Sequence, residues 1–412
     1  MATLKPYKNY TPVVYDYANE LPVGWQLLPN IAIFQERIER GHEKEELLSV
    51  TIGRGVIKQT EVDIKKDSSN EDKSKYKLIK VGDIAYNRMR MWQGALGYSN
   101  YQGITSPAYV ILKPKMKINQ RFFHYMFRTT FYTNYSKRFS YGIVDDQLSL
   151  RYTDFKRMYS ILPPIEVQNE IVNYLDTKTQ AIEKFIRNKE RFIELLEEER
   201  RGFIDRTIHQ ILKTPFEKKP LKYIVRLLSE QTTKRKENES YLALENIESW
   251  TGKIDLSIGA DEFESNAKRF RTTDVLFNKL RPYLAKVVVP EFNGICVSEL
   301  LVLRPSKQVL REFLFYKLIS RRFIDYIDSS TYGSKMPRAS WDVIGKVEIE
   351  FPNDLEIQRN IVSKIKEEES RIATLKTKIK KEIIAIKEYR EAIVTAVVTG
   401  KINVTEKQLQ LS

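Results

Sequence analysis

Apolar residues recur at helical spacing in two long stretches of the chain, one in its middle and one near its end. In the second stretch an isoleucine stands at every seventh position from residue 365 to residue 393. A strict seven-residue repeat predicts a helix that packs along a partner helix with a left-handed supercoil. The first stretch follows Pro163 and Pro164 and alternates its apolar residues at three and four positions, which predicts the partner. The predicted seam residues are Ile171, Leu175, Ile182, Phe185, Phe192, Leu196, Ile365, Ile372, Leu375, Ile379, Ile386 and Ile393.

Shorter apolar runs, separated by Gly, Asn and Pro, fill the regions outside these two stretches. Runs at 47–52, 83–87 and 108–112 are typical of strands. Residues 63–77 are polar and charged, which predicts a mobile loop. We therefore expect mixed α/β units with twisted sheets.

The chain carries the same pattern twice. Seven landmarks in the first half return 191 residues later, and further landmarks at the start of the long helices return after 190 residues. A repeat of this length exceeds the roughly 20–50 residues of a solenoid unit. It indicates a duplicated domain, each copy followed by a long helix. The first seven pairs are Asp83 and Asp274, Asn87 and Asn278, Arg90 and Arg281, Leu112 and Leu303, Pro114 and Pro305, Tyr141 and Tyr332, and Gly142 and Gly333.

The predicted fold class is α+β, with two mixed α/β domains separated by two long helices that form an antiparallel coiled coil with a pseudo-twofold internal repeat. Parallel packing is the alternative, because the repeated order alone does not fix the direction. Opposite seam charges, Lys178 and Lys189 against Glu368 and Glu382, favour pairing of the two helices with each other, unless these side chains only extend to the surface. The predicted parts are an arm at 1–20, domains at 21–165 and 214–353, helices at 166–213 and 354–400, and a tail at 401–412.

The charge of the chain narrows the choice of partner. There are 69 Lys and Arg residues against 54 Asp and Glu residues, a formal net charge of +15. Such an excess favours an anionic partner, most commonly nucleic acid. Cys296 is the single cysteine, so no intrachain disulfide can form. Together with the absence of a signal peptide and of an apolar run of about 18 residues, this predicts a cytoplasmic protein.

Cations, amides and aromatic side chains gather at the repeated landmarks. Asn and Arg suit base edges, while Lys and Arg neutralise phosphates. In the alternative interpretation the two asparagines cap turns and only the cations touch nucleic acid, and the tyrosines pack beside a turn. The predicted DNA-binding residues are Asn87, Arg88, Arg90, Tyr141, Asn278, Lys279, Arg281, Lys286, Tyr332, Lys335 and Arg338.

The sequence lacks patterns that predict catalysis. Gly53-Arg54-Gly55 has no third glycine in register, and no phosphate-binding loop or adenine methyltransferase box is present. His42, His124 and His209 are scattered, which predicts neither a zinc site nor a nucleophile with its base. We expect a binding protein with no catalytic residue, no metal and no cofactor of its own.

These motifs resemble those of the specificity subunit of type I restriction-modification systems, over nearly the whole chain. The similar segments are 82–90, 273–282, the helix starts at 163–168 and 352–358, and the C-terminal run at 397–402. Arg90 is followed by Met91, where the family usually has proline. The resemblance implies a bipartite, asymmetric DNA site with one half-site per domain. It also implies that the helices set the gap and dock two methyltransferase subunits.

The resemblance further implies that restriction subunits complete the complex, and that S-adenosylmethionine, ATP and Mg belong to partner subunits. Three other functions compete with this interpretation. A non-catalytic RNA-binding protein with a coiled-coil arm explains the basic domains, but not a matched pair of them. A coiled-coil scaffold leaves the charge unexplained, and a restriction enzyme in its own right lacks the motifs.

Overall fold

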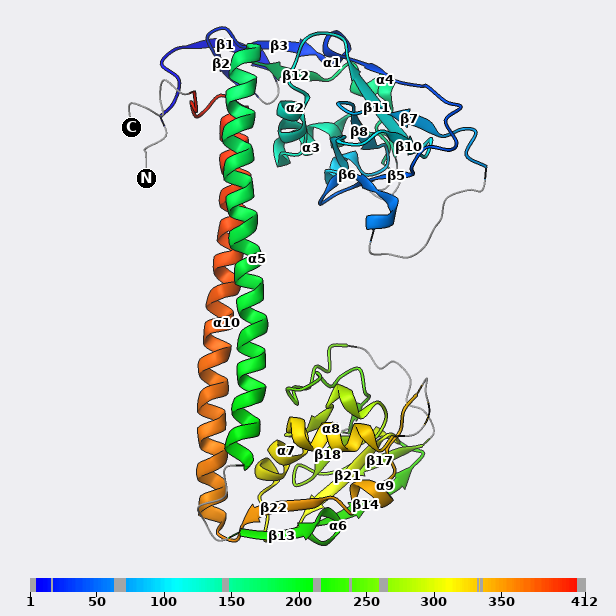
Figure 1. The fold of residues 1–412 in the computed structure, drawn as a ribbon, viewed down its shortest axis with the longest axis vertical. Helices are drawn as coiled ribbons and strands as arrows, with labels where there is room; N and C mark the ends of the chain where they lie inside the picture. Colours follow the sequence, from blue (N-terminus) through cyan, green and yellow to red (C-terminus); the bar gives the residue numbers. More distant parts are fainter. Residues whose placement is uncertain are drawn as a thin grey trace. The chain divides into compact units, whose positions relative to one another are not determined.

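The computed structural model divides the chain into two compact units, Met1–Asn188 with Glu382–Ser412, and Lys189–Lys381. Each unit combines sheets with helices, which confirms the α+β class (Figure 1). No helix among the described residues is long and apolar enough to cross a lipid bilayer. The structure describes residues 5–15, 18–62, 72–142, 148–209, 216–236, 239–258, 266–331, 333 and 336–405.

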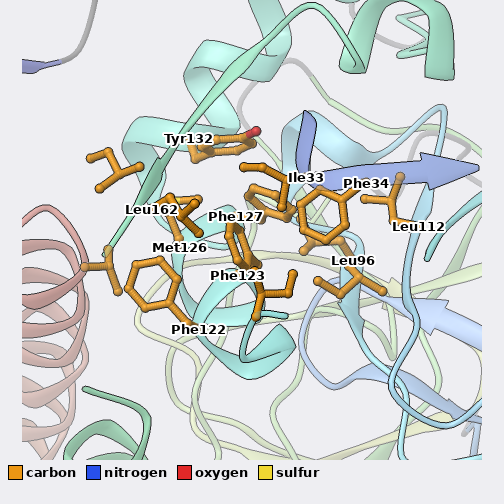
Figure 2. Packing of buried hydrophobic residues seen from close by; sticks show 14 of the residues in the cluster. Ile33, Phe34, Leu96, Leu112, Phe122, Phe123, Met126, Phe127, Tyr132 and Leu162 are labelled. Carbon is orange, nitrogen blue, oxygen red and sulfur yellow. The ribbon is translucent and has the colours of Figure 1, made fainter. Parts of the chain in front are cut away.

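The first unit is built around an antiparallel sheet with strand order β4-β11-β8-β9. Helices α2 and α3 contribute rings to its core, where Phe34 meets Phe123 and Phe127 at ring-centroid distances of 5.0 and 5.9 Å (Figure 2). Its elements are β1 (Tyr10–Tyr15), β2 (Ala18–Pro22), β3 (Gln26–Pro29), α1 (Asn30–Ile33), β4 (Phe34–Glu36), β5 (Leu48–Thr51), β6 (Gly55–Lys58), η1 (Gln59–Glu61), β7 (Lys77–Ile79), β8 (Ile84–Asn87), η2 (Met91–Gln93), β9 (Leu96–Tyr98), β10 (Gly103–Thr105), β11 (Tyr109–Pro114), α2 (Gln120–Phe127), α3 (Thr130–Arg138), α4 (Tyr152–Phe155) and β12 (Tyr159–Leu162).

The second unit contains a sheet of the same design, with strand order β14-β21-β18-β19, and a further sheet, β15-β17-β20-β16. The corresponding strands β8 and β18 both end at the repeated asparagine. Its elements are β13 (Phe216–Pro220), α6 (Leu221–Ile224), β14 (Val225–Leu228), β15 (Gln231–Thr232), β16 (Ser240–Leu242), β17 (Ala267–Phe270), β18 (Val275–Asn278), η5 (Pro282–Leu284), β19 (Val287–Val288), β20 (Gly294–Val297), β21 (Leu300–Pro305), α7 (Arg311–Ile319), α8 (Arg321–Ser329), α9 (Trp341–Ile344) and β22 (Glu348–Pro352).

Two segments differ from their expected form. The N-terminal segment, expected as an extended arm, contains the antiparallel hairpin of β1 and β2. Tyr15 of this hairpin packs against the core of the first unit. Of the segment expected as a mobile loop, residues 63–71 lie outside the described residues. Its last residue, Lys77, is buried in β7.

Two long helices, α5 (Ile165–His209) and α10 (Leu355–Val398), contribute residues to both units. Within each unit their segments run antiparallel. In the first unit, Glu183 of α5 lies 3.9 Å from Arg390 of α10. In the second unit, Arg200 of α5 lies 2.9 Å from Glu369 of α10. Low residue numbers in α5 therefore meet high ones in α10, as the antiparallel prediction requires.

The buried stripe of α5 differs from the predicted seam at two aromatic residues. Phe185 and Phe192 are 41% and 45% exposed, so their assignment to the seam is wrong. Ile186 is 8% exposed and takes the place of Phe185 in the stripe. Hydrophobicity alone favours the aromatic residue, but the buried position belongs to the next residue, Ile186, which is smaller and β-branched.

The other predicted seam residues are mostly buried. Leu375 and Ile386 are half-buried rather than buried. The residues that are less than 9% exposed are Ile171, Leu175, Ile182, Leu196, Ile365, Ile372, Ile379 and Ile393.

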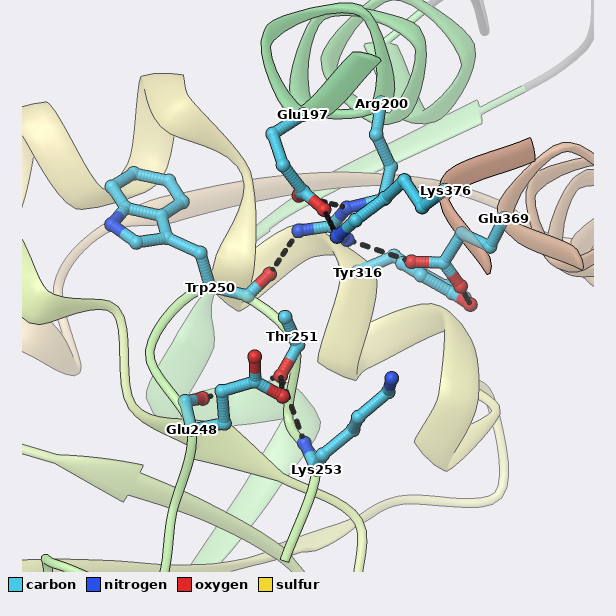
Figure 3. A network of polar contacts seen from close by, with 9 residues as sticks. All are labelled: Glu197, Arg200, Glu248, Trp250, Thr251, Lys253, Tyr316, Glu369 and Lys376. Atoms are coloured by element: carbon cyan, nitrogen blue, oxygen red, sulfur yellow. Dashed lines mark hydrogen bonds and ion pairs between the residues drawn. The ribbon is translucent and has the colours of Figure 1, made fainter. Parts of the chain in front are cut away.

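The charges that join the helices within the second unit include residues beyond those predicted. Glu368 pairs with Arg371 of its own helix at 2.6 Å. Contacts between the helices include Lys376 with Glu197 and Arg200 with Glu369 (Figure 3), and Arg371 with Glu199. Glu369, one position after the predicted Glu368, pairs with Arg200 of α5. Opposite charges therefore still link the two helices within the second unit.

Candidate nucleic-acid interface

The repeated asparagines shape a tight turn at the end of a strand. The side-chain oxygen of Asn87 accepts the N–H of Met89 at 2.9 Å, and that of Asn278 accepts the N–H of Leu280 at 3.1 Å. Asn278 also donates its amide to the carbonyl of Leu280 at 2.6 Å and is 3% exposed. Such side-chain to backbone bonds are how asparagine stabilises turns. The geometry therefore favours the interpretation in which the asparagines cap turns.

The second predicted cluster in each unit lies directly beside this turn. In the second unit, Leu280 pairs with Arg338, and the N–H of Arg281 donates to the carbonyl of Pro337 at 2.7 Å. In the first unit, the N–H of Leu150 donates to the carbonyl of Arg88 at 2.9 Å, and Tyr141 pairs with Ser149. Two segments that lie far apart in sequence thus form one surface in each unit. We call these surfaces ledge 1 (87–92 with 141–142 and 149–150) and ledge 2 (278–283 with 336–339).

Ledge 2 carries two cations around one carboxylate. Glu299 lies 2.8 Å from the guanidinium of Arg338 and 3.9 Å from the ammonium of Lys279. The side chains of Arg338 and Lys279 remain 46% and 31% exposed. Tyr283 and Met336 are 45% and 55% exposed beside them. Exposed cations next to an aromatic ring are suited to phosphate and base contacts.

Arg281 introduces a backbone feature that ledge 1 lacks. Its φ of 50° lies in the left-handed region, whereas the equivalent Arg90 has a φ of −130°. A non-glycine residue in this region is uncommon and is held there by its surroundings. In ledge 2 the bond from Arg281 to Pro337 and the following Pro282 supply that restraint.

Ledge 1 shares backbone hydrogen bonds with ledge 2, such as that of Arg88 to Ala108 and that of Lys279 to Glu299, but has different side chains. Ala108 occupies the position of Glu299, so the carboxylate of ledge 2 has no counterpart there. Tyr141 is 63% exposed, and the ammonium of Lys137 lies 4.8 Å from the ring centre of Trp92. Arg88 is half-buried and Arg90 is exposed. Two ledges of one design thus present different chemistry.

Three predicted residues stand apart from the ledges or cannot be placed. Lys286 donates its ammonium to the carbonyl of Leu244 at 2.6 Å, and burial lowers its pKa. It is therefore engaged within the fold, which argues against a role in DNA contact. Tyr332 and Lys335 lie outside the described residues.

Sequence reasoning missed a pair of lysines behind the ledges. Lys77 and Lys268 are 191 residues apart, like the landmarks, and donate to the carbonyls of Tyr109 and Leu300 at 2.9 and 3.0 Å. Those carbonyls belong to the strands β11 and β21, which pair with the strands that end at the ledges. The repeat spacing was the signal that could have found them.

A second overlooked residue, Trp250, connects Ala285, two residues after ledge 2, with α5 inside the second unit. Its N–H donates to the carbonyl of Ala285 at 3.1 Å, and its carbonyl accepts the guanidinium of Arg200 at 2.6 Å (Figure 3). Its ring lies 4.6 Å from the guanidinium carbon of Arg201, and its φ is 65°. Nothing in the sequence pattern distinguishes this tryptophan from a core residue.

Titratable groups among the described residues do not form a metal site. No group of three or more His, Cys, Asp or Glu side chains is placed there to hold a metal ion. Burial lowers the pKa of His124 to about 3, and its Nδ1 accepts the N–H of Tyr98 at 3.1 Å. This histidine is a structural acceptor at neutral pH.

Comparison with known proteins relates the chain to one family. Residues 226–385 match the model for the "Type I restriction modification DNA specificity domain". The "Type I restriction enzyme EcoDI specificity subunit" of Escherichia coli is 23% identical over 167 residues, which is 40% of this chain and 37% of that protein. The match thus spans little more than a third of that relative.

Solved structures share the fold. A chain described as "Structural basis underlying complex assembly and conformational transition of the type I R-M system" has a TM-score of 0.70 at 16% identity, covering 94% of this chain and 100% of its own. The HsdS subunit from Thermoanaerobacter tengcongensis has a TM-score of 0.53 at 17% identity, covering 92% and 98%. The fold that the resemblance implies is thereby confirmed.

Proposed function

Since the chain is a relative of the specificity subunits of type I restriction-modification systems, we propose that it reads a bipartite, asymmetric DNA site, one half-site per unit. The observation that carries the proposal is the pair of ledges. They have equivalent backbone hydrogen bonds at positions 191 residues apart and differ in their side chains. One scaffold used twice with unlike contact residues is suited to reading two unlike sequences.

Affinity and specificity come from different groups in this proposal. The net charge of +15 supplies attraction to phosphates, which falls steeply with salt. At ledge 2, Arg338 supplies a guanidinium fork and Lys279 a point charge, and the carboxylate of Glu299 pairs with both cations. Ledge 1 has Ala108 at this position, so its cations are not paired with a carboxylate in the same way.

The long helices act as a spacer and as a docking site in the same proposal. Helices of 45 and 44 residues that pair antiparallel within each unit support a stiff connection. The partners are double-stranded DNA, two methyltransferase subunits and, in a full complex, restriction subunits. The chain itself is non-catalytic, and S-adenosylmethionine, ATP and Mg act in those partners.

In vitro selection from randomised duplexes by the full purified chain tests this function. We expect two short specified blocks separated by a fixed gap. Replacing Lys279 and Arg338 together with alanine should weaken binding of the selected duplex about 10-fold or more. The control Lys222→Ala, which removes an exposed lysine on α6, should change it little. Enrichment of no motif from the duplexes, or tighter binding of single-stranded RNA in a parallel measurement, would contradict the proposal.

A further inference from the structure

The second unit contains a cationic cavity that the reading of DNA does not use. Its volume is about 350 Å³, and it is lined by the end of α5, by β13 and β22, and by α7 and α8. The lining includes His209, Lys218, Lys317, Arg322 and Glu350. We propose that this cavity binds a small, multiply charged anion, a phosphate group or a molecule that carries one.

Lys317 is the central observation. Its side chain belongs to α7 and is 2% exposed, although lysine is rarely buried without a charged partner. No carboxylate within 4.0 Å of its ammonium is found among the described residues, and the adjoining residues 210–215 contain no acidic residue. Its polar contact is Nδ1 of His209 at 3.4 Å. A buried charge without compensation is costly, and a bound anion would compensate it.

The first unit shows what this scaffold looks like without the cavity. By the repeat spacing of 191 residues, Lys317 corresponds to Met126, Arg322 to Phe131, and Lys218 to Leu27. All three counterparts are apolar and pack in or against the core of the first unit. Three apolar residues of one copy are therefore cations in the other, and all three line the same cavity. In the second unit these three positions give up apolar packing and surround one cavity, which indicates a ligand.

The region that forms the cavity in the second unit is filled by side chains in the first unit. Tyr326 lines the cavity, and its counterpart in the first unit is Tyr135. There the hydroxyl of Tyr15, from the N-terminal hairpin, lies 2.5 Å from the hydroxyl of Tyr135. Hairpin residues thus pack where the second unit keeps its cavity.

The remaining charges favour an anion over a cation. Lys218 lies 2.8 Å from Glu348 and 3.9 Å from Glu350, so these two carboxylates are already neutralised in part. Arg322 stands in the first turn of α8, whose N-terminal dipole also favours negative charge. A DNA backbone is too wide to reach an ammonium that is buried in a cavity of this size. A free ion or a small phosphate ester has access.

Calorimetric titration of the full chain tests the proposal, with inorganic phosphate, sulfate and ATP as separate probes at constant ionic strength. We expect saturable binding of one ion per chain by phosphate or sulfate, weakened at least 10-fold in Lys317→Met. The methionine is the residue that the first unit already accommodates at this position. The neighbouring variant Lys219→Met, which removes a lysine paired with Glu217 on the same strand, should bind as the original chain does.

The three probes separate the sources of the anion. Tighter binding of ATP than of phosphate assigns a phosphate ester, and equal binding assigns the free ion. Binding that is unchanged in Lys317→Met while the variant keeps its circular dichroism spectrum would overturn the proposal. An equal loss in Lys219→Met, which indicates general screening of a basic protein, would overturn it as well.

Discussion

Among single residues, Lys317 offers the most direct measurement, the pH dependence of stability. Burial lowers its pKa to about 7, well below that of an exposed lysine. The unfolded chain therefore binds more protons than the folded chain from about pH 7 upward, so stability rises with pH in that window. The charged or titratable groups around it are His209, Lys218, Arg322, Tyr326, Lys346, Glu348 and Glu350, and Asp205 also acts on it electrostatically.

Between pH 7 and pH 9 the original chain should gain about 2 kcal/mol of unfolding free energy relative to Lys317→Met. Saturating sulfate should flatten this slope, because an anion favours the ammonium and raises its pKa. Urea unfolding of both proteins at several pH values measures the difference. His209 does not interfere, since burial lowers its pKa to about 4. If the unfolding free energies of the two proteins changed with pH in the same way, Lys317 would not have a lowered pKa in the folded chain.

Much at this scale could be read from the sequence, and some could not. The repeat located both ledges, because identical residues at constant spacing imply identical turns. It did not reveal that the side chain of Asn278 is hydrogen-bonded within its own turn. An asparagine that caps a turn and one that contacts a base look alike in sequence. Nor did it reveal that Lys286 is held by a carbonyl, because that contact joins residues 42 apart.

At the scale of elements, the stripe of α5 is the feature that sequence periodicity located only approximately. Seven-residue spacing found the stripe of α10, where isoleucine is the repeated residue. In α5 the aromatic residues Phe185 and Phe192 each precede an isoleucine, and hydrophobicity alone favours the aromatic residue. Packing between helices decides otherwise, because the space between the backbones admits a branched aliphatic side chain.

Truncation of these neighbours tests the register. Ile186→Ala should lower the unfolding free energy by about 2–5 kcal/mol, as expected for a buried aliphatic residue. Phe185→Ala should cost less than about 1 kcal/mol, because its ring is 41% exposed. Urea denaturation of the two variants provides the comparison. A larger loss for Phe185→Ala would restore the predicted seam.

At the scale of the whole molecule, the proposed spacer predicts a change in the gap between half-sites. Removing seven residues from α5 and seven from α10 keeps the seven-residue register, so the helices should still pair. Each helix shortens by about 10 Å, which corresponds to about three base pairs. In vitro selection with the shortened chain should return the same two blocks with a smaller gap. An unchanged gap would show that the helices do not set it.

The central claim, two unlike readers of DNA on one chain, is tested most directly by methylome sequencing of a host that carries the chain with its modification subunit. We predict methylated adenines within a motif of two specified blocks and a fixed gap. We further predict that the Lys279→Ala, Arg338→Ala double variant relaxes one block and leaves the other intact. A single uninterrupted motif, or relaxation of both blocks by this variant, would contradict the account.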